Sequence, residues 1–194
     1  MIRSPLRAGI ALACALSLSA CGGGDGDLYV SGNATGVTKT GLVLQNNGGD
    51  DLAVNQSGPF IFPGLVETDS RYNVTVKSVP ANVEKLTDCV VTNGTGRAVF
   101  NVSNVFVACT IRKWELGGTI VGLGDATGLE LVNGTDRLVV PANATTFQMA
   151  KVSEESPYGI SVLKQPAGRT CAVENSSGTM QAANVTNVVV RCTQ

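Results

Sequence analysis

Apolar and polar residues alternate along several short segments of the chain. In residues 72–76 (YNVTV) every second side chain is apolar, and residues 158–162 (YGISV) carry a similar alternation. This period of two is typical of a β-strand with one buried face. Four further pairs of apolar residues, each separated by one residue, are expected to point toward the core in the same way. They are Leu42 and Leu44, Phe60 and Phe62, Leu129 and Leu131, and Phe147 and Met149.

Stretches rich in asparagine and glycine separate these segments. Residues 46–51 (NNGGDD) and the shorter stretch 133–136 (NGTD) each lie between two apolar runs. Asn and Gly adopt positive φ at low cost, so a β-hairpin is expected at both places. Residues 93–94 (NG) and 175–178 (NSSG) predict one further turn in each half of the chain.

The segments occur twice in the same order, 82 to 87 positions apart. Residues 40–44 (TGLVL), for example, correspond to residues 127–131 (TGLEL). Such self-similarity indicates one supersecondary unit that is present twice. We therefore expect an all-β fold of two tandem, small antiparallel β-sandwich domains, residues 28–110 and 114–194, joined by a linker at 111–113.

The first 27 residues have a composition of their own. Arg3 and Arg7 precede an apolar run over residues 8–18, which leads into LSAC at 18–21 and GGGDGD at 22–27. This order of segments resembles the signal peptide of bacterial lipoproteins, in which a lipobox of this form ends in the cysteine that carries lipid.

The resemblance implies that residues 1–20 are cleaved as a signal peptide and that Cys21 is lipidated. Residues 21–27 would then be a flexible tether to the membrane. An ordinary secretory peptide cut before Cys21 is the alternative, whereas a transmembrane helix requires a longer apolar run, of about 18 residues. Lipoproteins held at the inner membrane usually carry Asp after the cysteine, so Gly22 indicates the outer membrane. This residue does not distinguish the periplasmic side of that membrane from its outer side.

Four cysteines remain when the signal-peptide cysteine and the lipid acceptor are set aside. An even number in an exported protein indicates disulfide bonds, and four cysteines allow three pairings. The repeat favours Cys89–Cys109 and Cys171–Cys192, because each domain then contains its own bridge. A zinc site is the alternative, but the sequence lacks close Cys-x-x-Cys pairs.

The repeated unit resembles one found in exported lipoproteins and large surface proteins of Gram-negative bacteria. The second copy matches well, with QPAGRTC at residues 165–171 and NVTNVVVRC at 184–192. The first copy departs from the pattern, since eight residues separate Pro80 from Cys89. The resemblance implies an immunoglobulin-like or related β-sandwich, which serves as a spacer in some proteins and as a binding surface in others.

Catalytic, metal and cofactor chemistry has little support in the sequence. There is no histidine, no Gly-x-Ser-x-Gly motif and no nucleotide-binding glycine loop. The adjacent acids Asp50 and Asp51, and likewise Glu154 and Glu155, are interpreted as solvated loop charges rather than as catalytic pairs. We therefore expect a protein that is not an enzyme and has no cofactor or metal site.

The charge pattern gives no sign of a nucleic-acid partner. Cleavage of the signal peptide would leave 12 basic residues against 15 acidic ones, with no run of either sign. We expect a lipid-anchored structural or interaction module, whose partner is an envelope protein or a glycan. The alternatives are an accessory or inhibitor protein for a periplasmic enzyme or envelope complex, and a hydrolase with unusual catalytic residues. Trp114, the only tryptophan, is interpreted as packing at the domain seam rather than as an exposed ring for a ligand.

Overall fold

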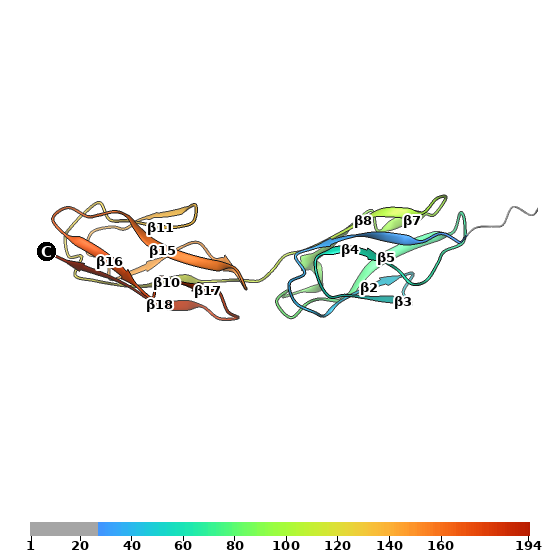
Figure 1. Cartoon of the computed structure of the whole chain (residues 1–194), viewed down its shortest axis with the longest axis horizontal. Helices are drawn as coiled ribbons and strands as arrows, with labels where there is room; N and C mark the ends of the chain where they lie inside the picture. The colour runs from blue at the N-terminus through green and yellow to red at the C-terminus, as the bar shows by residue number, and fades with distance from the viewer. Residues whose placement is uncertain (1–26) are drawn as a thin grey trace, which may run out of the picture.

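The computed structural model describes residues 27–194. The signal peptide, the lipobox with Cys21 and most of the tether therefore lie outside the described residues. The described chain folds into two β-sandwiches that lie end to end (Figure 1), so the predicted all-β fold with two tandem sandwiches is confirmed. The N-terminal end of the described chain lies at one extremity of the molecule, and the C-terminus lies at the other.

The first sandwich contains eight strands and one 3-10 turn, η1 (Leu86–Asp88). The strands are β1 (Val30–Thr35), β2 (Leu42–Asn46), β3 (Asp50–Val54), β4 (Gly58–Ile61), β5 (Arg71–Ser78), β6 (Cys89–Thr92), β7 (Thr95–Arg97) and β8 (Val102–Cys109). They form two four-stranded sheets, with the orders β4-β1-β8-β6 and β3-β2-β5-β7.

The second sandwich repeats this arrangement. Its strands are β10 (Leu116–Val121), β11 (Glu130–Asn133), β12 (Asp136–Val139), β13 (Thr146–Gln148), β15 (Pro157–Lys164), β16 (Thr170–Glu174), β17 (Ser177–Thr179) and β18 (Val185–Thr193). The sheet orders are β13-β10-β18-β16 and β12-β11-β15-β17. A two-stranded ladder of β9 (Lys113–Trp114) and β14 (Val152–Ser153) lies at the start of this sandwich.

The two hairpins expected from the Asn/Gly stretches are present. β2 pairs with β3 across residues 47–49, and β11 pairs with β12 across residues 134–135. The apolar pairs predicted to face inward also do so, because all eight of their side chains are buried. Each sandwich has its own apolar core, one built from residues 30–109 and the other from residues 116–192.

Each sandwich also contains one parallel strand pair, which differs from the antiparallel arrangement predicted. β1 runs parallel to β8, and β10 runs parallel to β18. These partners are the first and last strands of a sandwich, and the strands between them supply the long connection that parallel pairing requires. A register shift interrupts each pair, next to Gly32 in β1 and next to Gly118 in β10.

The turns predicted at residues 93–94 and 175–178 are corners between sheets. β6 pairs with β8 in one sheet, whereas β7, which follows directly, pairs with β5 in the other sheet. β16 and β17 divide between the two sheets of the second sandwich in the same way. Asn93 and Asn175, with φ of 55° and 53°, lie at the bends, where asparagine tolerates the left-handed conformation. Within residues 27–194 no helix is long and apolar enough to span a membrane.

Candidate functional site at the junction of the two sandwiches

An ion pair closes the junction between the two sandwiches. Lys39, in the loop between β1 and β2, places its Nζ 2.5 Å from Oε1 of Glu154, which follows β14. Glu155 lies further away, with Oε1 3.6 Å from the same Nζ. The Glu154 side chain is only 3% exposed, whereas that of Lys39 is 36% exposed. A lysine of the first sandwich therefore neutralises a buried carboxylate of the second.

Trp114 lies at the same seam. Its Nε1 donates a hydrogen bond to the second Glu154 oxygen, Oε2, at 3.1 Å, and the guanidinium of Arg112 lies 5.6 Å from the centre of the ring. The indole is half-buried against the core of the second sandwich. Trp114 pairs with Val152 as Leu28 pairs with Val66, so it takes the position in the second repeat that Leu28 has in the first.

The chain between the sandwiches forms backbone hydrogen bonds with both of them. The Arg112 amide donates to the carbonyl oxygen of Asn82 at 2.8 Å, and the Arg112 carbonyl accepts from the Glu154 amide at 2.9 Å. Lys113, which the sequence assigns to the linker, already belongs to β9. The junction is therefore a structured contact, whereas an unbonded chain would leave the two sandwiches free to reorient.

The residues between Pro80 and Cys89 make part of this contact. Asn82 is fully buried, and its Nδ2 donates to Thr38 Oγ1 at 2.7 Å. The second repeat has only four residues between the corresponding Pro166 and its cysteine. The longer loop of the first repeat thus contacts the linker at the junction, through the hydrogen bond between Asn82 and Arg112.

Electrostatics at the junction favour the charged forms of both partners. The hydrogen bond from Lys39 holds the pKa of Glu154 below its ordinary value of 4.5, although burial acts in the opposite direction. The Glu154 hydrogen bond likewise raises the pKa of Lys39 above 10.5. The stabilisation from Glu154 is therefore complete above about pH 4.5 and is lost as the pH falls through the lowered pKa. That from Lys39 is complete below about pH 10.5 and is lost as the pH rises through the raised pKa.

Replacing the junction lysine should change the titration of Glu154. In Lys39→Met the buried carboxylate loses its main cation, so its pKa should rise. Trp114 donates to this carboxylate and is the only tryptophan, so a pH titration of its fluorescence reports the protonation of Glu154. We expect the acid transition of the fluorescence to move to higher pH in this variant.

Lys77→Met is the matched control for that measurement. It removes an ion pair of the same 2.5 Å length, formed with Asp51, but this pair is solvent-exposed and lies within the first sandwich. Its fluorescence titration should follow that of the parent. Identical titrations for the parent and both variants would contradict the role given to Lys39.

The interpretation of the acidic pairs as solvated loop charges is wrong for Glu154, which is buried and paired. It also fails for the other pair, since Asp50 and Asp51 lie in β3. Asp51 contacts Gln45 and Lys77, while Asp50 Oδ2 accepts from the Gly64 amide at 3.1 Å. In the second repeat, Asp136 accepts from the Ala150 amide at 2.7 Å, so Asp50 has a structural counterpart. Asp50 and Asp51 thus have separate partners, whereas Glu154 and Glu155 share Lys39.

Each sandwich has one disulfide. Cys89 is bonded to Cys109, and Cys171 is bonded to Cys192, which are the pairs expected from the repeat. Each bond joins directly opposed residues of adjacent strands within one sheet. Antibody domains instead place their disulfide between the two sheets.

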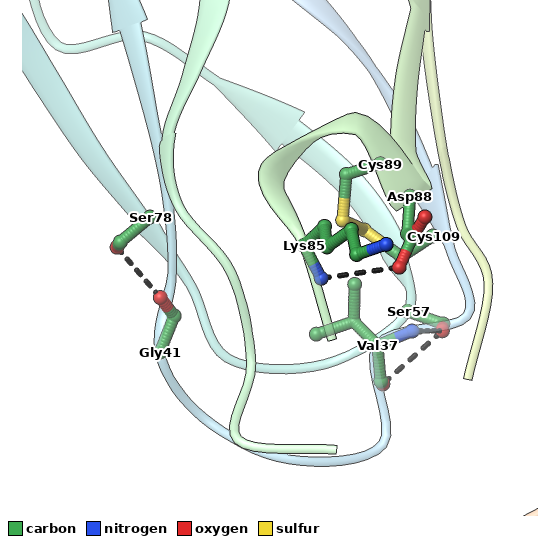
Figure 2. The surroundings of a disulfide bond; sticks show 8 residues. All are labelled: Val37, Gly41, Ser57, Ser78, Lys85, Asp88, Cys89 and Cys109. Atoms are coloured by element: carbon green, nitrogen blue, oxygen red, sulfur yellow. Dashed lines mark hydrogen bonds between the residues drawn. A yellow bond between two sulfur atoms is a disulfide. The ribbon is translucent and has the colours of Figure 1, made fainter. Parts of the chain in front are cut away.

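Figure 2 shows the surroundings of the first of these bonds. Next to it, the Val37 amide donates to Ser57 Oγ at 3.0 Å, and this hydroxyl donates back to the Val37 carbonyl at 3.2 Å. The Lys85 amide donates to Asp88 Oδ2 at 3.1 Å. The bridge and these bonds together hold the loops at the end of the first sandwich that faces the second.

A groove of about 450 Å³ crosses β10, β13 and β18 of the second sandwich. Gly117 and Gly118 leave part of its lining without side chains, while Glu115, Gln148 and Thr186 contribute polar atoms. Among the described residues, no three His, Cys, Asp or Glu side chains gather so that they could hold a metal ion. The groove therefore offers a partner both hydrogen-bonding groups and the apolar surface of Phe147 and Val185.

Comparisons with known proteins give similarities of fold at low sequence identity. No family model matches the chain, and no curated protein matches it either. Among solved structures, the chain is similar to the TIE protein of Bacillus anthracis, with 13% identity and a TM-score of 0.36 over 86% of this chain. The chain spans 34% of the length of that protein.

Two pilins are also similar. The minor pilin GBS52 of Streptococcus agalactiae has 11% identity and a TM-score of 0.31, with 87% of this chain and 97% of the pilin covered. A mutant of the shaft pilin SpaA of Lactobacillus rhamnosus GG has 8% identity and a TM-score of 0.30, covering 87% and 99% respectively. At these values none of the three proteins transfers a function to this chain.

Proposed function

We propose that the chain is a lipid-anchored structural or interaction module of the outer membrane, attached through Cys21. The observation that carries the proposal is the end-to-end arrangement of two sandwiches, with the first described residues at one extremity and the C-terminus at the other (Figure 1). The bonded linker and the Lys39–Glu154 pair stiffen this arrangement. Such a stalk holds its distal loops away from the anchor, where a protein or glycan partner can reach them.

Two further features support a role in the cell envelope. The disulfides are suited to an oxidising compartment, where such bonds form and persist. The groove on β10, β13 and β18 offers a partner both polar and apolar lining groups. An accessory role at an envelope complex would use the same surfaces, whereas catalysis lacks a candidate group within the described residues.

Replacing the lipid acceptor tests the anchor. Cys21→Ser should release the protein into the soluble fraction, because several acyl chains bind a membrane stably whereas one myristoyl chain binds only marginally. Cys14→Ser is the matched control, since this cysteine lies in the signal peptide outside the lipobox, and the variant should stay membrane-bound.

Membrane association of Cys21→Ser that equals the control would contradict lipid anchoring. Separation of inner and outer membranes on a density gradient then tests the location. We expect the parent protein in the outer-membrane fraction, and recovery with the inner membrane would contradict the sorting inferred from Gly22.

A further inference from the structure

Five exposed apolar side chains gather at the end of the first sandwich where the described chain begins. Phe100 is 80% exposed, the highest value in the set, and the others range from 37% to 58%. The set, called the tether-end residues below, consists of Tyr29, Ile61, Leu65, Val99 and Phe100.

Hydrogen bonds place these residues near the entry of the chain. The Tyr29 amide donates to Asn101 Oδ1 at 3.2 Å, and the Val102 amide donates to the Tyr29 carbonyl at 2.9 Å, which holds the loop of Val99 and Phe100 beside β1. Leu65 precedes Val66, which exchanges two backbone hydrogen bonds with Leu28. Ile61 ends β4, where it pairs with Ser31 near the start of β1.

The second sandwich lacks this apolar set. The same backbone pairings identify the equivalent positions: the Glu115 amide donates to Asn184 Oδ1 as the Tyr29 amide does to Asn101, and Gln148 pairs with Gly117 as Ile61 pairs with Ser31. The five equivalents are Glu115, Gln148, Lys151, Ala182 and Ala183.

The fold itself therefore does not require apolar residues at these positions. In the second sandwich this end faces the first sandwich, and its residues are polar or small. Only in the first sandwich does the same end face the tether. The exposed residues at this end are thus apolar in the copy that adjoins the tether and polar or small in the copy that faces another sandwich.

We propose that the tether-end residues insert into the lipid surface of the membrane to which the chain is anchored, which restricts the tilt of the two-sandwich rod. This inference rests on the proposed lipid on Cys21. Six Cα–Cα steps separate Cys21 from Asp27, so at 3.8 Å per step the sandwich starts within about 23 Å of the lipidated residue. Aromatic and aliphatic side chains at that distance reach the headgroup region, where they bind favourably.

Because the tether is short, even weak contacts between these side chains and lipid are enough for membrane insertion. A short flexible linker gives an effective concentration of about millimolar, so insertion that is negligible for free protein becomes populated once the chain is anchored. Charge is not taken as the driving force, since Arg97 is paired with Asp69 at 2.8 Å. Insertion should therefore occur in zwitterionic bilayers as well as in anionic ones.

Vesicle experiments test the insertion separately from lipidation in cells. The mature chain, residues 21–194, with both disulfides closed has Cys21 as its single free thiol and is coupled to a maleimide lipid in phosphatidylcholine vesicles. In a Trp114→Phe background, Phe100→Trp should give blue-shifted emission that brominated lipid quenches. Ala183→Trp, at the equivalent position of the second sandwich, is the matched control and should show neither effect.

A second reporter identifies the residues responsible. Leu65→Trp in the same background should also be quenched, and adding Val99→Ala and Phe100→Ala, the residues of the second copy, should reduce that quenching. Circular dichroism verifies that every variant keeps its strand structure. Emission of the anchored Phe100→Trp protein that matches the Ala183→Trp control would overturn the inference, whatever the fractionation of Cys21→Ser shows.

Discussion

Gly118→Ala should strongly destabilise the second sandwich. A Cβ added at Gly118 would lie 1.8 Å from the carbonyl oxygen of Val188, its partner in the parallel pair of β10 and β18. The obstacle is backbone, and Val188 is fully buried, so neither strand can withdraw without disturbing the close-packed core. We expect a loss of more than about 3 kcal/mol, against about 4–12 kcal/mol for a typical domain of about 80 residues.

Urea unfolding followed by Trp114 fluorescence measures this effect, because the only tryptophan packs against the second core. Gly159→Ala is the matched control: the added Cβ meets no heavy atom within 4 Å, so the transition should stay within about 0.5 kcal/mol of the parent. Gly32→Ala, whose Cβ would lie 1.9 Å from the Val105 oxygen, should instead unfold the first sandwich. An unchanged midpoint for Gly118→Ala would mean that the two strands are not paired as described.

Removal of a disulfide should have the second large effect. The bond between Cys171 and Cys192 closes a loop of 21 residues, for which the chain-entropy model gives about 3 kcal/mol. Both cysteines are buried, and alanine at the two positions leaves no unpaired polar group. The double variant Cys171→Ala/Cys192→Ala should therefore unfold at lower urea concentration by Trp114 fluorescence.

The corresponding change in the first sandwich separates local from general effects. Cys89→Ala/Cys109→Ala should destabilise the first sandwich and largely spare the transition that Trp114 reports. Peptide mapping without reductant should recover the two within-sandwich pairs. A peptide that links Cys89 to Cys171, or a parent protein with four free thiols, would refute the pairing.

Local patterns in the sequence account for the strands, the hairpins and the repeat. Tyr72 and Val74 alternate with polar residues because β5 has one face on the core and one in water, a property that neighbouring residues reveal. The turn at Asn47 and Gly48 is equally local, since both residues adopt positive φ. The repeat also favoured the observed disulfides, because a bridge within each unit needs no knowledge of how the units meet.

Tertiary structure alone decided the features that depend on distant residues. The parallel pairing of Val30 with Val102 joins the two ends of a domain, and the alternation within either strand is the same for both directions of pairing. Glu154 looks like a loop acid in the sequence, and its burial depends on Lys39, 115 positions away.

The clustering of the tether-end residues also depends on the tertiary structure. Phe100 and Leu65 are far apart in the sequence, and each one alone reads as core or as an ordinary exposed side chain. Only the return of β4 and the corner before β7 bring their loops to one end of the sandwich. A strand's periodicity records which face is buried, whereas the identity of its neighbour and the surroundings of its loops are set by the topology of the whole chain.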